Sequence, residues 1–143
     1  MLVNIAIGLA TMVICLMLQA LLVALAVRFY SRRKSWVTQG SMASSFAVLS
    51  AVMLALVVGN ALQIAVWAGL FVMLEEFVDF SVALYHSAVN FATLGYGDIV
   101  MSERYRLLGP LEAINGVLMI GVSTAVVMWA LQDVLESAMS SRD

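Results

Sequence analysis

The sequence predicts an all-α integral membrane protein with three transmembrane helices and one shorter, re-entrant helix. Hydrophobic residues make up 64% of the 143 residues, and charged residues only 11%. A soluble domain of this size could not bury so much apolar surface. Three apolar runs are each long enough to cross a bilayer, which takes about 20 helical residues. A fourth apolar segment is too short to cross.

The first apolar run, Leu2–Val27, predicts an N-terminal transmembrane helix. The run is longer than the apolar core of a signal peptide and has its basic flank after it, so we expect a retained helix rather than a cleaved leader. It contains no arginine or lysine, so it cannot sense voltage as an arginine-rich helix does. With the basic loop that follows, it forms the expected N-terminal unit, residues 1–42.

Four basic residues lie together after this run, at Arg28, Arg32, Arg33 and Lys34. Short loops rich in arginine and lysine stay in the cytoplasm. We therefore expect the N-terminus outside, the C-terminus in the cytoplasm, and a multi-pass protein in a plasma membrane, most simply a prokaryotic inner membrane.

The other two long runs, Ala43–Leu74 and Leu107–Leu131, predict helices over residues 43–74 and 104–135. The first of these must tilt or project beyond the membrane because of its length. Between them, Phe80–Ala92 predicts a helix only about 20 Å long. The helix is too short to cross the bilayer, so non-helical backbone must lie next to it at membrane depth. Such backbone is tolerated only where protein covers it or where it lines water.

The hexapeptide Thr-Leu-Gly-Tyr-Gly-Asp, residues 93–98, follows the short helix directly. In a potassium filter, backbone carbonyls replace the water shell of the ion. Successive carbonyls must then face one axis, which requires dihedral angles that Gly95 and Gly97 tolerate. Leu94 and Tyr96 are expected to point back into the protein and to brace the segment.

This pattern, after a short helix and between two membrane helices, resembles the pore module of the tetrameric potassium channel superfamily. The resemblance covers residues 43–143 and leaves the first helix outside it. It implies an outer helix, a pore helix, a selectivity filter and an inner helix at residues 43–74, 80–92, 93–98 and 104–135. The alternative, an ordinary glycine-rich turn, fits the flanking helices less well.

The resemblance also implies which groups bind potassium. They are the filter carbonyls, with the Thr93 hydroxyl at the inner end, in the segment Thr93, Leu94, Gly95, Tyr96 and Gly97. Two departures from the family pattern bear on filter rigidity. Ala92 stands where threonine or serine is usual, and Met101 stands where proline is common.

Four residues are expected to support the filter. Tyr85 matches a position that bonds the aspartate after the filter, here Asp98. His86 matches an aromatic donor position, so it is expected to bond Tyr96 as a neutral imidazole, with proton sensing as the less favoured role. Glu112 is an acid inside a membrane helix, where an unpaired carboxylate is expensive. We expect it to bond the pore helix, through Ser87 or Asn90, or else Asn115.

Residues expected at the cavity and gate lie on the third long helix. They are Gly116, Ile120, Thr124 and Met128. The last three share one helix face at four-residue spacing. Gly116 and Gly121 suit either a hinge or close helix packing. An acidic cluster, Glu75, Glu76 and Asp79, either rings the outer mouth and attracts cations or forms a solvated loop with a helix cap.

Together these features predict a potassium-selective channel that conducts passively through a homotetramer in a lipid bilayer. A weakly selective cation channel and a non-conducting subunit that regulates a partner are the alternatives. We expect no enzyme activity, no cofactor besides the permeant K⁺, no nucleic-acid partner and no soluble regulatory domain in this chain.

Overall fold

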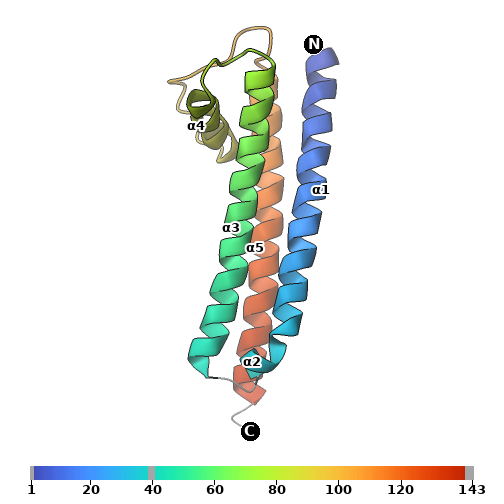
Figure 1. Cartoon of the computed structure of the whole chain (residues 1–143), viewed down its shortest axis with the longest axis vertical. Helices are drawn as coiled ribbons and strands as arrows, with labels where there is room; N and C mark the ends of the chain where they lie inside the picture. Colours follow the sequence, from blue (N-terminus) through green and yellow to red (C-terminus); the bar gives the residue numbers. More distant parts are fainter. Residues whose placement is uncertain (1, 39–40, 141–143) are drawn as a thin grey trace.

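The computed structural model describes residues 2–38 and 41–140, and every regular element in them is an α-helix. The helices are α1 (Leu2–Arg32), α2 (Lys34–Thr38), α3 (Met42–Met73), α4 (Phe80–Phe91) and α5 (Leu108–Ser140). Figure 1 shows α1, α3 and α5 side by side as a long bundle, with α4 at one end and α2 at the other. The short helix α4 contacts α3 and α5, and no packing of α4 on α1 is found among the described residues.

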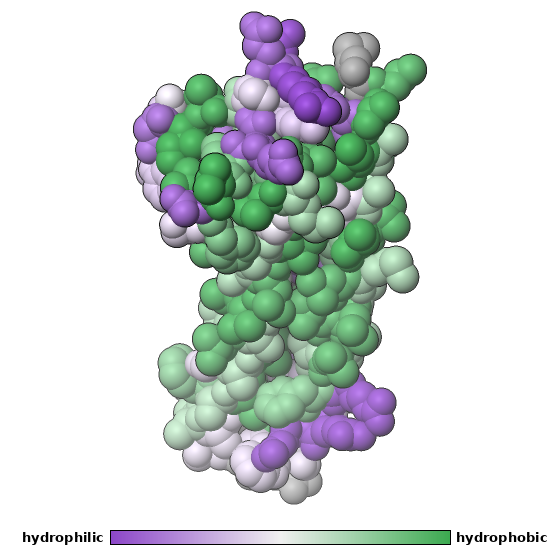
Figure 2. All heavy atoms as spheres, turned by 45° about the horizontal axis from the view of Figure 1, so that its top comes forward, coloured by the Kyte–Doolittle hydropathy of each residue, from purple (hydrophilic) through white to green (hydrophobic). Residues whose placement is uncertain are grey.

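Within the described residues, the three helices α1, α3 and α5 are long and apolar enough to cross a membrane, so the chain is a multi-pass membrane protein. Figure 2 shows the matching surface, with hydrophobic side chains along the middle and hydrophilic ones gathered at the two ends. This is the pattern expected of helices whose middles face hydrocarbon and whose ends face water.

The helix boundaries differ from the predicted ones mainly at α5. This helix begins at Leu108, not at residue 104, because the chain first makes two tight turns. The Tyr105 and Leu108 N–H groups close them by donating to the Ser102 and Tyr105 carbonyls, at 3.1 and 2.9 Å. Pro110 then falls in the first turn of α5, where its missing N–H removes no helical hydrogen bond.

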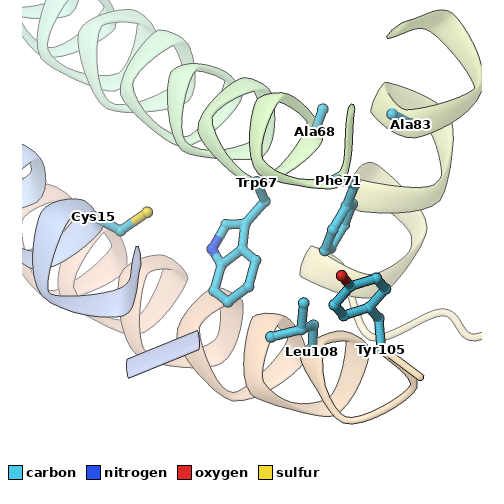
Figure 3. Close-up of a cluster of buried hydrophobic side chains, with 7 residues drawn as sticks. All are labelled: Cys15, Trp67, Ala68, Phe71, Ala83, Tyr105 and Leu108. Carbon is cyan, nitrogen blue, oxygen red and sulfur yellow. The ribbon is translucent and has the colours of Figure 1, made fainter. Parts of the chain in front are cut away.

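The core near α4 joins all four of the main helices. Its buried members are Cys15, Trp67, Ala68, Phe71, Ala83, Tyr105 and Leu108. Figure 3 shows the rings of Trp67 and Phe71 reaching from α3 toward Leu108 and Tyr105, with Cys15 of α1 beside the Trp67 indole nitrogen. This cluster fixes α4 against the ends of the long helices.

A buried polar layer crosses the middle of the bundle. Gln63 of α3 donates to Gln19 of α1 (2.7 Å), and Gln19 donates to the Ser123 hydroxyl of α5 (2.9 Å). Both glutamines and Ser123 are buried. An unpaired amide in an apolar interior costs about 1–3 kcal/mol, so mutual pairing holds α1 in register with α3 and α5.

At Gly116 of α5, two stretches of main chain approach each other closely. A Cβ atom built on Gly116 would lie 2.0 Å from the Phe91 carbonyl oxygen and 2.8 Å from its carbon. The last turn of α4 therefore rests on the backbone of α5, and only glycine leaves room for it. The packing interpretation of Gly116 is confirmed, whereas a hinge role stays a prediction. Nothing lies within 4 Å of a Cβ on Gly121.

We predict that Gly116→Ala displaces α4 and destabilises the protein by about 1–3 kcal/mol or more, the usual cost of overpacking. The matched variant Gly121→Ala adds the same methyl group to the same helix and should be tolerated. Thermal unfolding of the two purified variants in detergent compares them. Equal unfolding temperatures for both would contradict the close contact.

Candidate functional site

The segment 93–98 begins where α4 ends, and the end of α4 sets its direction. Ala92 is the C-cap, and Thr93 follows with φ of 59°. The Thr93 N–H donates to the Asn90 carbonyl (2.8 Å), and the Leu94 N–H donates to the Val89 carbonyl (2.9 Å). These two bonds and the left-handed residue make a Schellman motif. The position usually holds glycine, so threonine here is a strained choice.

Left-handed backbone recurs at every second residue of the segment. Thr93, Gly95 and Gly97 have φ of 59°, 58° and 74°. The sequence predicted the two glycines but not Thr93, whose conformation belongs to the helix cap. This alternation departs from an ordinary strand, in which successive carbonyls point to opposite sides.

The backbone of Gly95, Tyr96 and Gly97 has no hydrogen-bond partner in the chain, as far as the structure describes it. All three residues are exposed. In hydrocarbon such groups would each cost several kcal/mol, so the segment must either be covered by protein or line a water-filled space.

The chain itself does not cover Leu94 and Tyr96, so the expected bracing of the segment by these side chains stays a prediction. The side chains are 55% and 65% exposed. Any cover for them has to come from outside this chain.

Tyr85 and Asp98 form the expected pair. The Tyr85 hydroxyl donates to Asp98 Oδ2 (2.7 Å), and Asp98 Oδ1 accepts the Ile99 N–H (3.0 Å). The Tyr85 bond lowers the pKa of Asp98 and raises that of Tyr85. Both side chains are exposed, so the pair restrains the end of the segment with little gain in stability.

His86 does not bond Tyr96 as predicted. Its Nδ1 lies 3.1 Å from the Ile99 carbonyl oxygen, and its Nε2 lies 2.9 Å from the Asn90 amide nitrogen. A carbonyl can only accept, so Nδ1 carries the proton and Nε2 accepts from Asn90. Both nitrogens of a neutral imidazole are thereby used, and none is left for Tyr96. The ring also stacks at an angle on Phe77, with centroids 5.0 Å apart.

Glu112 is fully buried and bonds the Ser87 hydroxyl, one of the two expected partners on α4. Ser87 also reaches the Ile64 carbonyl of α3 at 2.8 Å. A hydroxyl has one proton and the carbonyl can only accept. When the Ser87 hydroxyl donates to the Ile64 carbonyl, its oxygen can only accept from Glu112. The carboxyl group of Glu112 must then carry a proton and donate it to Ser87. This set of three groups ties α4 to both long helices.

Three of the residues predicted to line the cavity share a groove between α3 and α5, and their role in a cavity stays a prediction. Ile120, Thr124 and Met128 line one groove with α3 residues, and its volume is about 270 Å³. Gly116, one turn earlier, does not line this groove and is buried under Phe91.

One clamp was missed by the sequence analysis. Glu76, at the end of α3, accepts from both the backbone N–H and the hydroxyl of Ser102, the latter at 2.7 Å. It thereby holds the loop that follows the segment, instead of lying free at a mouth. No spacing rule joins residues 76 and 102, so only the folded structure shows this contact.

Comparison with known proteins gives one match. The model of a family described as "Ion channel" matches residues 61–133, a little more than half of the chain. No curated protein and no solved structure matches the chain. The matched range contains α4, the segment 93–98 and most of α5, and it excludes α1.

We predict that Thr93→Gly stabilises the fold, by about 0.4–1 kcal/mol, because glycine suits left-handed backbone. Glu75 is a matched control: it has φ of 57° and closes α3 with the same two hydrogen bonds. Glu75→Gly should stabilise similarly. If the hydroxyl of Thr93 acts on ions, only Thr93→Gly will alter ion flux in liposomes. Equal effects of both variants on flux would contradict a role for that hydroxyl.

We predict that stability falls as the pH drops below about 6.5, the unfolded-state pKa of histidine. Burial lowers the pKa of His86, against a raising effect of the Ile99 carbonyl. As the pH falls, the unfolded chain therefore binds the histidine proton before the folded chain does. The free energy of unfolding decreases between the unfolded-state pKa and the lower folded-state pKa. The chain has one histidine, so His86→Gln should remove the slope in unfolding temperature between pH 7 and 5. An unchanged slope would assign it to other groups.

Proposed function

The chain belongs to the ion-channel family, and we propose that it conducts potassium ions selectively through a pore formed by four copies. The observation that carries this proposal is the backbone of residues 93–98. Its left-handed residues alternate, and its central peptide groups are unpaired and exposed. Unpaired carbonyls offered to a dehydrated cation are the basis of potassium selectivity.

The position of the segment supports the same proposal. It continues directly from the C-terminal end of α4, whose last carbonyls carry the negative end of the helix dipole. A cation at this end is stabilised. The bond between Tyr85 and Asp98 restrains the other end of the segment.

The proposal of four copies starts from two things that one chain does not supply: a closed ring of carbonyl groups, and cover for the exposed side chains of the segment. One chain supplies one loop, and a closed ring of carbonyls needs several. The exposed Leu94 and Tyr96 side chains require cover that only further copies would bring to this place. The resemblance noted for the motif gives the number four.

Topology is proposed on the charge rule. The basic cluster lies at the end of the bundle opposite α4 (Figure 1). If that end is cytoplasmic, as arginine-rich loops are, the segment 93–98 lies on the outer side of a plasma membrane.

We predict that liposomes containing the purified protein release potassium when they are loaded with potassium, and that they do not release sodium when they are loaded with sodium. Equal sodium flux would indicate a weakly selective cation channel. No flux from homogeneous protein would indicate a non-conducting subunit. Native mass spectrometry should give the mass of four chains.

The variant Gly95→Ala tests the segment itself. A Cβ at this position meets no neighbour, but alanine resists the φ of 58°. We therefore expect the four-chain mass to persist and potassium flux to be lost. Gly69→Ala on α3, where an added Cβ also meets nothing within 4 Å, is the matched control and should conduct. Normal selective flux from Gly95→Ala would overturn the proposal.

A further inference from the structure

An apolar groove runs between α1 and α3, on a part of the chain that the family match does not include. Its volume is about 340 Å³, many times the roughly 30 Å³ of one water. The lining residues are Leu22, Leu25, Ala26, Phe29, Ala51, Val52 and Ala55. Two exposed alanines, Ala51 and Ala55, leave the space open on the α3 side.

The groove lies within the membrane-crossing lengths of both helices. From Leu22 to Phe29 it follows about 10 Å of α1. Its side chains offer no hydrogen-bonding group, so water gains nothing by entering. An occupant drawn from the bilayer is an acyl chain.

Positively charged side chains lie at the end of α1, next to the groove. Residues 22, 26 and 29 lie on one face of α1, at spacings of four and three. Arg33 follows in the turn after α1, and its N–H still donates to the Phe29 carbonyl (3.2 Å). The Arg33 guanidinium lies 5.9 Å from the Phe29 ring, which lines the groove, and 4.3 Å from the Trp36 ring. Arg32, exposed at the end of α1, adds a second charge.

We propose that this groove binds one anionic phospholipid. Its acyl chain occupies the groove, and its phosphate lies on Arg32 and Arg33. The stacking on Phe29 and Trp36 holds Arg33 at the end of the groove, where a headgroup lies when the chain is inserted. Guanidinium groups suit phosphate because they can donate two parallel hydrogen bonds.

The test is native mass spectrometry of the purified protein with phosphatidylglycerol or phosphatidylcholine of identical chains. Phosphatidylglycerol should bind more tightly. Arg32→Gln with Arg33→Gln should weaken it by about fivefold for each arginine removed, while phosphatidylcholine changes little. Arg104→Gln is the matched control, because Arg104 stacks on Tyr105 (5.0 Å) near the other end of the bundle.

A second variant separates a built site from charge alone. Ala55→Leu fills the groove and leaves both arginines, and it should abolish the preference for phosphatidylglycerol. Ala24→Leu adds the same bulk to an exposed position outside the groove and should leave binding unchanged. Glycerol 3-phosphate, a headgroup without chains, should fail to displace the lipid.

Three results would overturn the proposal. If the double arginine variant loses phosphatidylglycerol binding and Ala55→Leu keeps it, the lipid is attracted by charge and the groove is not a binding site. Displacement by glycerol 3-phosphate would show a phosphate site without a chain. Unchanged lipid binding in Ala55→Leu, with loss of the oligomer, would identify a second copy as the occupant. If Arg32→Gln with Arg33→Gln fails to fold, Arg32→Lys with Arg33→Lys keeps the charge and should retain part of the preference.

Discussion

The contact of α4 with the backbone of α5 is the constraint on which the candidate site depends. The segment 93–98 has little internal hydrogen bonding, so its position is that of the helix from which it continues. That helix is fixed by Phe91 against Gly116 and by Ser87 against two long helices. Beyond the segment, Glu76 and Tyr85 hold the chain again. An irregular segment is thus placed by rigid elements on both sides, as a binding site requires.

The same need for partners explains why α1 is part of the bundle. A glutamine in a membrane helix is expensive when it faces lipid. Gln19 avoids that cost by bonding Gln63 of α3 and Ser123 of α5. The first helix is therefore bonded to α3 and α5, although the family match does not include it.

Much of the fold could be predicted because it follows from local rules. Three long apolar runs and one short one gave the helices, and the hexapeptide gave the candidate site. The bond of His86 with the Ile99 carbonyl and the clamp of Glu76 on Ser102 could not be predicted, because each joins residues in different elements by shape alone. The cover of Leu94 and Tyr96 stays a prediction, because their own chain leaves both side chains exposed.

Thr93 shows how local stability and the site conflict. A glycine would close α4 with less strain, since the motif places this residue in the left-handed region. Strain by itself does not identify function, because the exposed Glu75 closes α3 in the same conformation. What distinguishes Thr93 is its place in the alternation with Gly95 and Gly97 and the hydroxyl it brings to the end of the unpaired backbone. A residue that local rules disfavour, at the start of a segment that local rules leave unsatisfied, is the pattern expected where a fold has been shaped by what it binds.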